Sequence, residues 1–237
     1  MGSEKRYPIK RSRFSSHSKI ASYLNGEIFV RSGGRAGILD IGCAKGEMRD
    51  LLQGKAIKYV GVEPFLEDYL SAKANGLEVV FSSAENAVKE IKSQFDFIIF
   101  ADVLEHLQNP TTILKECHNL LNPEGEIVIS IPNVAHFSNR LGLLFGMWNY
   151  GERGILDKTH LRFYTKPSFE KEIQDCGFLV KQSSSTPIPL EALFPRMNEY
   201  LFKILDFVFY YPTLIYPKLF GYQLLFIISP VDQHSSQ

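Results

Sequence analysis

A short stretch around two glycines holds the first residue types in the chain that could do chemistry. An apolar run at residues 37–41 leads to Gly42, and Gly46 follows, ahead of a helix-like pattern. This order predicts a buried parallel strand, a tight turn and the start of a helix. Because glycine tolerates positive φ and lets a ligand approach the main chain closely, we expect a nucleotide-like ligand at the carboxyl end of this strand.

Two acids accompany these glycines. Asp40 lies just before the turn, and Glu63 ends the next short apolar strand at residues 59–63. Their separation is close to the ~20 residues expected for an acid that accepts hydrogen bonds from ribose hydroxyls. The glycines, however, follow the pattern D-x-G-x-x-x-G and not the G-x-G-x-x-G that holds a pyrophosphate at a helix N-terminus. An acid before the turn suits a cationic ligand better than a phosphate.

These residues together resemble motif I of the class I S-adenosyl-L-methionine (SAM)-dependent methyltransferases. The resemblance implies that SAM is the cofactor and that Glu63 binds its ribose. It also implies cofactor contacts from the turn itself, at Asp40, Gly42, Cys43 and Gly46.

Two later segments extend the resemblance. Residues 83–85 follow a short strand, where the family places an acid or amide against adenine, so the match implies that Ala84 and Glu85 border adenine. A helix N-terminus with an acid in its first turn explains the same residues equally well. Residues 101–107 follow an almost continuously apolar strand and resemble motif IV, which implies cofactor contacts from Asp102 and Val103.

Strand and helix patterns alternate five times, which predicts an α/β fold with helices on both faces of a parallel sheet. The resemblance implies a doubly wound, mostly parallel seven-stranded sheet with an antiparallel last strand, the Rossmann-like methyltransferase fold. We expect one domain with three parts. These are a basic arm and short helix (1–35), a cofactor-binding core (36–132), and an acceptor side (133–237) that includes a helical lid insertion (187–221).

Three histidines are candidates for acceptor chemistry. Residues 157–165 resemble an acceptor-facing loop in a bacterial branch of the family, found among methionine-W-like, quinone-type and surface-saccharide methyltransferases. An oxygen acceptor must lose a proton, and histidine is the usual base near neutral pH. His160 is the first choice, with Asp157 placed to orient it or to stabilise its charge; His106 is second and His136 third. A structural role remains open for each of them.

The insertion at 187–221 is rich in Leu, Phe and Tyr. Its apolar run at 201–216 carries charges and is shorter than the ~20 residues that span a bilayer. It could be a lid over an apolar acceptor, a contact with a membrane surface, a dimer face or a plain helical cap. The basic residues within 1–18 predict either a solvated terminus or an arm that covers the cofactor or touches anionic lipid.

Composition narrows the function classes. Lys plus Arg and Asp plus Glu number 26 each, so no nucleic-acid partner is expected. The three cysteines are scattered, with no CxxC or Cys/His cluster, so we expect neither disulfides nor a metal ion. Residues 1–20 are polar and basic, unlike a signal peptide, so we expect a cytoplasmic protein, or one peripheral to the inner face of the membrane.

The sequence therefore predicts a SAM-dependent methyltransferase that O-methylates a small, saccharide or lipid-linked acceptor. One alternative is a catalytically silent, methyltransferase-like binding module, because cofactor residues alone do not prove turnover. Another is an NAD-binding oxidoreductase, which the missing third glycine and motif IV disfavour.

Overall fold

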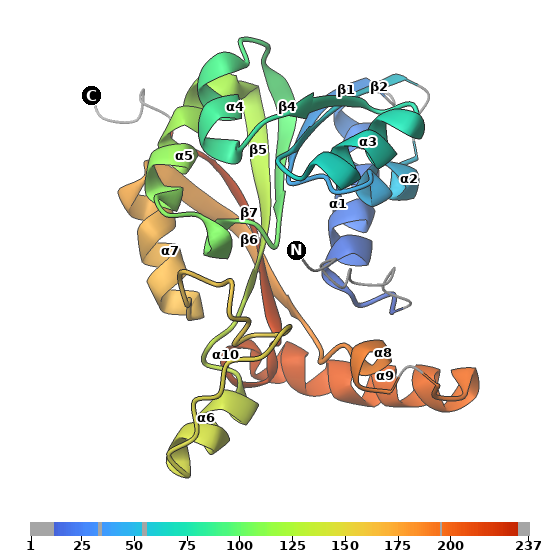
Figure 1. Ribbon diagram of the computed structural model, residues 1–237, viewed down its shortest axis with the longest axis vertical. Helices are drawn as coiled ribbons and strands as arrows, with labels where there is room; N and C mark the ends of the chain where they lie inside the picture. The colour runs from blue at the N-terminus through green and yellow to red at the C-terminus, as the bar shows by residue number, and fades with distance from the viewer. Residues whose placement is uncertain (1–11, 33–34, 54–55, 195, 232–237) are drawn as a thin grey trace.

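A seven-stranded sheet in the order β3-β2-β1-β4-β5-β7-β6 forms the centre of the molecule (Figure 1). The computed structural model describes residues 12–32, 35–53, 56–194 and 196–231. β7 runs antiparallel to both of its neighbours, and the other pairs are parallel, which confirms the predicted fold class. The strands are β1 (Arg35–Ile41), β2 (Ala56–Glu63), β3 (Glu78–Phe81), β4 (Phe95–Ala101), β5 (Leu121–Pro132), β6 (Phe178–Thr186) and β7 (Gln223–Pro230).

Helices cover both faces of this sheet. On one face lie α1 (Ser16–Ser32), α2 (Glu47–Leu51) and α3 (Leu66–Ala74); on the other lie α4 (Ala84–Glu90), α5 (Pro110–Glu116) and α7 (Lys166–Asp175) (Figure 1). Short 3₁₀ turns, η1 (Leu104–His106) and η2 (Cys117–Leu120), follow β4 and α5.

The central strands are buried on both faces because two separate cores sandwich them. In β1, Ile38 belongs to the core under α1–α3, whereas Leu39 belongs to the core under α4, α5 and α7. Their partners in β4, Phe97 and Ile98, divide in the same way. Side chains alternate between the faces of a strand, so a continuously apolar run is what a doubly covered strand requires.

Four further helices extend beyond the carboxyl edge of the parallel strands, at the bottom of Figure 1. They are α6 (Phe137–Leu144), α8 (Leu190–Leu193), α9 (Glu199–Ile215) and α10 (Pro217–Phe220). Across the described ranges, no helix combines the length and apolar character needed to cross a membrane.

The structure refines several predicted element boundaries. The apolar residues of one face predict a helix over 20–30, whereas α1 begins at Ser16. Pro110 predicts the start of a helix over 111–121, and the structure divides this segment into α5 and η2. The Pro and Gly within 122–126 predict a turn. In the structure this segment is an irregularity within β5, because Leu121 and Glu126 pair with Phe95 and Phe97 of the same neighbouring strand.

The end of the predicted basic arm that the structure describes is packed against α9. The Ser12 hydroxyl donates to both carboxylate oxygens of Asp206 at 2.8 and 2.7 Å, and the Phe14 ring stacks on Tyr210 at 3.9 Å. Residues 12–18 are therefore not a solvated tail, whereas residues 1–11 of the predicted arm lie outside the described residues.

Candidate active site

The loop between β1 and α2 has the backbone that its glycines predict. Gly42, Ala44 and Gly46 have φ angles of 78°, 47° and 90°. A Cβ on Gly42 would lie 2.6 Å from Cγ2 of Val103, so no side chain fits there without a shift. The motif I loop thus touches the motif IV loop directly, and both lie at the carboxyl edge of the sheet.

Glu63 fastens the motif I loop to the end of β2. Its carboxylate accepts hydrogen bonds from the backbone N–H of Ala44 and of Phe65, both at 2.9 Å. The side chain is buried, which raises the pKa of the carboxyl. Glu63 therefore shapes the loop, and its predicted contact with ribose stays a prediction.

Asp40 and Cys43 are buried beneath the same loop. The Tyr59 hydroxyl donates a hydrogen bond to the Asp40 carboxylate, and burial raises the pKa of that carboxyl to about 7. The Cys43 amide donates to the Val62 carbonyl at 3.1 Å. Both residues support the loop from below, and no described contact tests their predicted role toward the cofactor.

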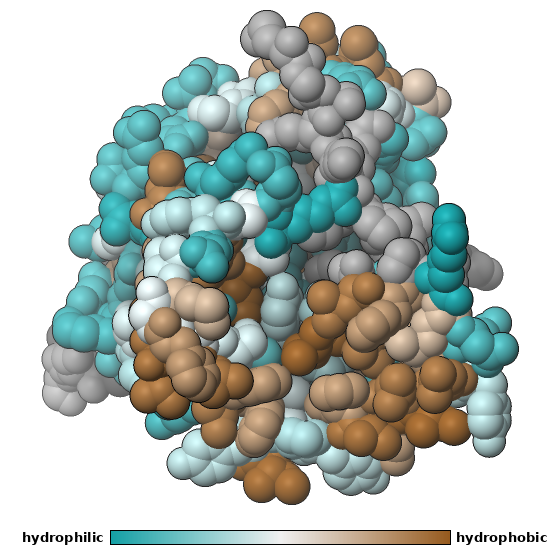
Figure 2. Space-filling view, turned by 60° about the horizontal axis from the view of Figure 1, so that its bottom comes forward, coloured by the Kyte–Doolittle hydropathy of each residue, from teal (hydrophilic) through white to brown (hydrophobic). Residues whose placement is uncertain are grey.

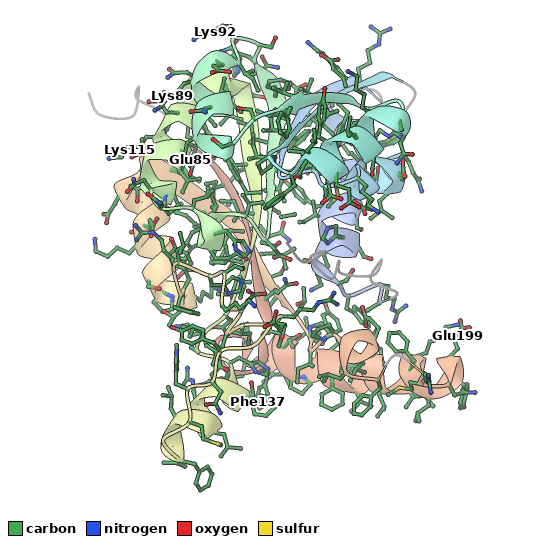
Figure 3. All side chains as sticks on the ribbon, in the orientation of Figure 1. Glu85, Lys89, Lys92, Lys115, Phe137 and Glu199 are labelled. Atoms are coloured by element: carbon green, nitrogen blue, oxygen red, sulfur yellow. The ribbon has the colours of Figure 1, made fainter. Side chains whose placement is uncertain are left out.

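The proposed adenine border lies at the start of α4. Ser83 caps this helix, with its hydroxyl accepting from the amide of Asn86 at 3.4 Å. Ala84 is buried, and Glu85 lies in the first turn, at the end of α4 nearer the middle of the molecule (Figure 3). The geometry agrees with an ordinary capped helix, and an adenine contact remains compatible with it.

Asp102 has a strained backbone and a fixed side chain. Its φ is 59°, which is unusual for a non-glycine residue. Its carboxylate accepts from the Ser130 hydroxyl at 2.6 Å and from the Gln223 side-chain amide at 2.7 Å. β5 and β7 thereby hold the motif IV loop, through two residues that sequence reasoning did not single out.

His160 is oriented by a backbone carbonyl rather than by Asp157. Its Nδ1 lies 3.0 Å from the Ile155 carbonyl oxygen, and burial lowers the pKa of the imidazole. The Asp157 carboxylate accepts instead from the amide and hydroxyl of Thr159, at 2.8 and 2.7 Å. Asp157 therefore affects His160 only electrostatically, because its charge favours the protonated imidazole. The Ile155 carbonyl, and not Asp157, orients the ring.

The structure brings the first and second candidate histidines together. The His106 and His160 rings meet edge to face, with centroids 4.7 Å apart. His106 is exposed, and its Nδ1 lies 3.3 Å from the Thr159 carbonyl oxygen. The backbone carbonyl of Glu105 accepts from the amides of Leu161 and Arg162, which ties the acceptor loop to motif IV.

His136, the third candidate, is part of the framework. Its side chain is buried and caps α6, where Nδ1 accepts from the Ser138 amide at 3.3 Å. Burial lowers the pKa of this imidazole to about 4. A neutral, capping histidine agrees with the structural role left open for it.

A family model described as a methyltransferase domain matches residues 20–183, well over half of the chain. The chain belongs to this methyltransferase family. The predicted membership of the class I, SAM-dependent type is thereby confirmed, together with its Rossmann-like fold.

Two solved structures of methyltransferases share the fold of this chain. A SAM-dependent methyltransferase from Archaeoglobus fulgidus is 19% identical, with a TM-score of 0.59 over 91% of this chain and 96% of that one. The plantazolicin methyltransferase BamL, determined with SAH, is 18% identical, with a TM-score of 0.61 over 91% and 84% of the two chains. SAM as the predicted cofactor is consistent with these structures.

A curated relative is named as an oxygen methyltransferase. The ubiquinone biosynthesis O-methyltransferase of Pseudomonas aeruginosa (strain LESB58) is 29% identical over 102 residues, which cover 40% of this chain and 44% of that one. The match thus spans less than half of the relative's length.

Proposed function

We propose that this methyltransferase transfers the methyl group of SAM to an oxygen atom of a small hydroxylated acceptor. The observation that carries the proposal is the His106–His160 pair, held at the carboxyl edge of the sheet beside the loop that bears the cofactor motif. The name of the Pseudomonas relative supports an oxygen acceptor. A silent binding module has no need of two imidazoles at this position.

The protein itself has little covalent chemistry to do in this reaction, because the methyl group passes directly from the cofactor to the acceptor. A lone pair of the acceptor oxygen attacks the methyl carbon, and the carbon–sulfur bond breaks with its electrons remaining on sulfur. S-adenosylhomocysteine (SAH) leaves, and the acceptor hydroxyl releases its proton. Because the sulfonium is a good leaving group, the main task is to hold oxygen and methyl carbon ~3–3.5 Å apart. The imidazoles are placed to assist the loss of the proton.

The test compares His160→Ala with Lys158→Ala, a change in the same loop at an exposed residue whose ion pair with Glu152 is also exposed. Methyl transfer from labelled SAM is measured over a panel of phenols, catechols and saccharides. We expect kcat to fall about 10²–10⁴-fold in His160→Ala, with SAM affinity retained in both variants. Full activity of His160→Ala on an acceptor that the wild type methylates would contradict the proposal.

We further propose that the acceptor is presented at a lipid surface, which α6 and α9 contact. The buried side of α9 holds two polar residues, Asp206 and Thr213, beside Phe202, whereas most of its apolar side chains are exposed. Figure 2 shows apolar side chains gathered in two groups on the face that carries these helices. Exposed lysines, Lys203 and Lys218, suit anionic head groups. The exposed apolar side chains of the two helices are Leu141, Leu143, Leu144, Tyr200, Leu201, Ile204, Phe207, Val208, Phe209, Tyr211, Leu214 and Ile215.

Flotation with phosphatidylglycerol vesicles tests this contact. We expect the full chain to float and the double variant Ile204→Glu, Val208→Glu to remain at the bottom. Leu179→Glu, a change of an exposed leucine at the start of β6, is the matched control and should float. A dimer in sedimentation that the double variant dissociates, without flotation of the wild type, would assign the face to a second copy instead.

A further inference from the structure

Three potential metal ligands from two distant segments converge beside the proposed acceptor position. Glu105 and His106 belong to η1, directly after motif IV, and His160 belongs to the acceptor loop. One candidate ligand atom from each of the three side chains lies within 4.8 Å of the other two. Among the described residues, no other group of histidine, cysteine and carboxylate side chains meets this condition.

Both imidazoles are already oriented as metal-ligating histidines are. Such a histidine donates its second ring N–H to a carboxylate, a backbone carbonyl or water, which fixes the tautomer and the direction of the ring. Nδ1 of His160 lies 3.0 Å from the Ile155 carbonyl, and Nδ1 of His106 lies 3.3 Å from the Thr159 carbonyl. In each ring this leaves Nε2 with a lone pair for an ion.

The carboxylate completes a known type of donor set. The Glu105 side chain is only 1% exposed, and burial of a carboxylate beside two imidazoles favours a positive charge among them. Two imidazole nitrogens and one carboxylate are the ligands of several catalytic zinc sites and of the non-haem iron triad, which leave coordination positions open.

We propose that Glu105 and the Nε2 atoms of His106 and His160 bind one divalent transition-metal ion, such as Zn²⁺ or Mn²⁺. Metal–ligand bonds of ~2.1 Å place neighbouring ligand atoms about 3–3.5 Å apart. From the 4.8 Å limit, the three groups need to approach by at most ~1.3–1.8 Å, which small side-chain rotations supply, that of the exposed His106 above all. Asp102 contributes negative charge nearby, but its carboxylate is held by Ser130 and Gln223.

The ion would change the role of His160. A ligating imidazole has no lone pair left to accept the acceptor's proton, so His160 becomes a ligand and not a general base. The acceptor hydroxyl, bound at an open position, loses its proton to solvent water more readily because the cation stabilises the oxyanion. This part rests on the proposed methyl transfer, whereas binding of the ion does not.

Direct measurement of metal binding tests the site without an acceptor. Tag-free full-length protein is stripped with a chelator, which is then removed, and titrated with Mn²⁺ and Zn²⁺ by calorimetry, with the paramagnetic resonance of Mn²⁺ as a second readout. We expect one ion per chain and a loss of affinity of at least 100-fold in His106→Ala and His160→Ala. Because His106 is exposed, its variant should fold, which unchanged melting and SAM binding would confirm. Lys158→Ala is the control and should bind normally.

Two outcomes would overturn the site: no stoichiometric ion in the wild type, or an ion whose affinity neither histidine variant changes. Undiminished methyl transfer by metal-free protein would overturn the role of the ion in the reaction, while leaving the ion site and the proposed function intact. An ion bound through these residues in a protein that methylates no acceptor would support the site and count against the proposed function.

Discussion

At Gly42 the backbone and the neighbouring loop together exclude a side chain. It combines a φ of 78° with a Cβ position 2.6 Å from Val103. We therefore expect Gly42→Val to abolish SAM binding. Gly76→Val is the matched control, because Gly76 has a φ of 76° but nothing within 4 Å of its Cβ position. The control should lose on the order of 1–3 kcal/mol of stability through backbone strain and still bind SAM in a calorimetric titration. Near-normal binding by Gly42→Val would place the ligand elsewhere.

The Glu63 side chain has one observed role, in the motif I loop, and one predicted role, in binding ribose. It accepts two backbone hydrogen bonds that shape the loop, and its position matches the ribose-binding acid. Glu63→Ala should weaken SAM binding by about 1.5–3 kcal/mol, the worth of hydrogen bonds to a charged group, and should also lower the melting temperature. Glu78→Ala, at an exposed position on β3, should do neither. Unchanged affinity in Glu63→Ala would show that the ribose lies away from this acid.

Asp40 makes stability depend on pH. Burial raises the pKa of its carboxyl to about 7, from about 3.9 in an unfolded chain. A raised pKa favours the protonated form in the folded state, so this stabilisation is complete below pH ~4 and disappears as the pH rises through ~7. We expect the free energy of unfolding, measured by urea denaturation, to fall by up to ~1.4 kcal/mol per pH unit within that window. Asp40→Asn should make this slope smaller, with the remainder coming from other buried carboxyls such as Glu63, and an unchanged slope would contradict the assignment.

At the scale of elements, we expect the insertion at 187–221 to be separable from the predicted cofactor frame. Thr186 at the end of β6 pairs with Gln223 at the start of β7, so a short turn can join the two strands. A variant in which a Gly/Ser turn replaces residues 187–221 should still bind SAM with the affinity of the full chain, since the predicted cofactor loops lie after β1, β2, β3 and β4. Calorimetry of the folded variant checks this. Loss of SAM binding by a folded variant would assign part of the cofactor site to the insertion.

Elements were predictable from sequence where burial decides their pattern. The sequence pattern predicts a helix over 66–74 and strands over 78–81 and 95–100. α3 and β3 have these bounds, and β4 is one residue longer, because apolar runs and helix-ending residues are local signals. Which face of α9 packs against the rest of the protein was not predictable. Its apolar residues predict a helix but do not reveal that the polar Asp206 and Thr213 face inward, since Ser12 and Ser185, from remote segments, contact those two residues.

The same limit applies to the candidate site. The motif I loop and Glu63 are close in sequence, so their meeting follows from one strand–turn–helix unit and the next strand. The contact between His106 and His160 spans the whole acceptor loop and depends on the amides of Leu161 and Arg162 reaching the Glu105 carbonyl. No spacing in the sequence indicates it. Ser130 and Gln223 gave no signal either, because each is an ordinary residue of a strand.

At the scale of the whole molecule, the sheet brings the segments predicted to hold the cofactor and the acceptor to one edge. Strands β1, β2 and β4 end in the loops that carry the cofactor motifs, and the acceptor loop and helices α6 and α9 lie beyond the same edge (Figure 1). Phe137, the first residue of α6, packs against Phe220 of α10, with ring centroids 5.7 Å apart (Figure 3). The proposed methyl transfer therefore requires SAM to bind at this edge.

Calorimetric titration of the full chain with SAM, SAH and NAD tests that requirement most directly. The acid before the turn, the glycine spacing and Glu63 predict that SAM and SAH each bind at one site per chain and that NAD produces no binding heat. Binding of NAD without binding of either sulfur-containing ligand would contradict the account.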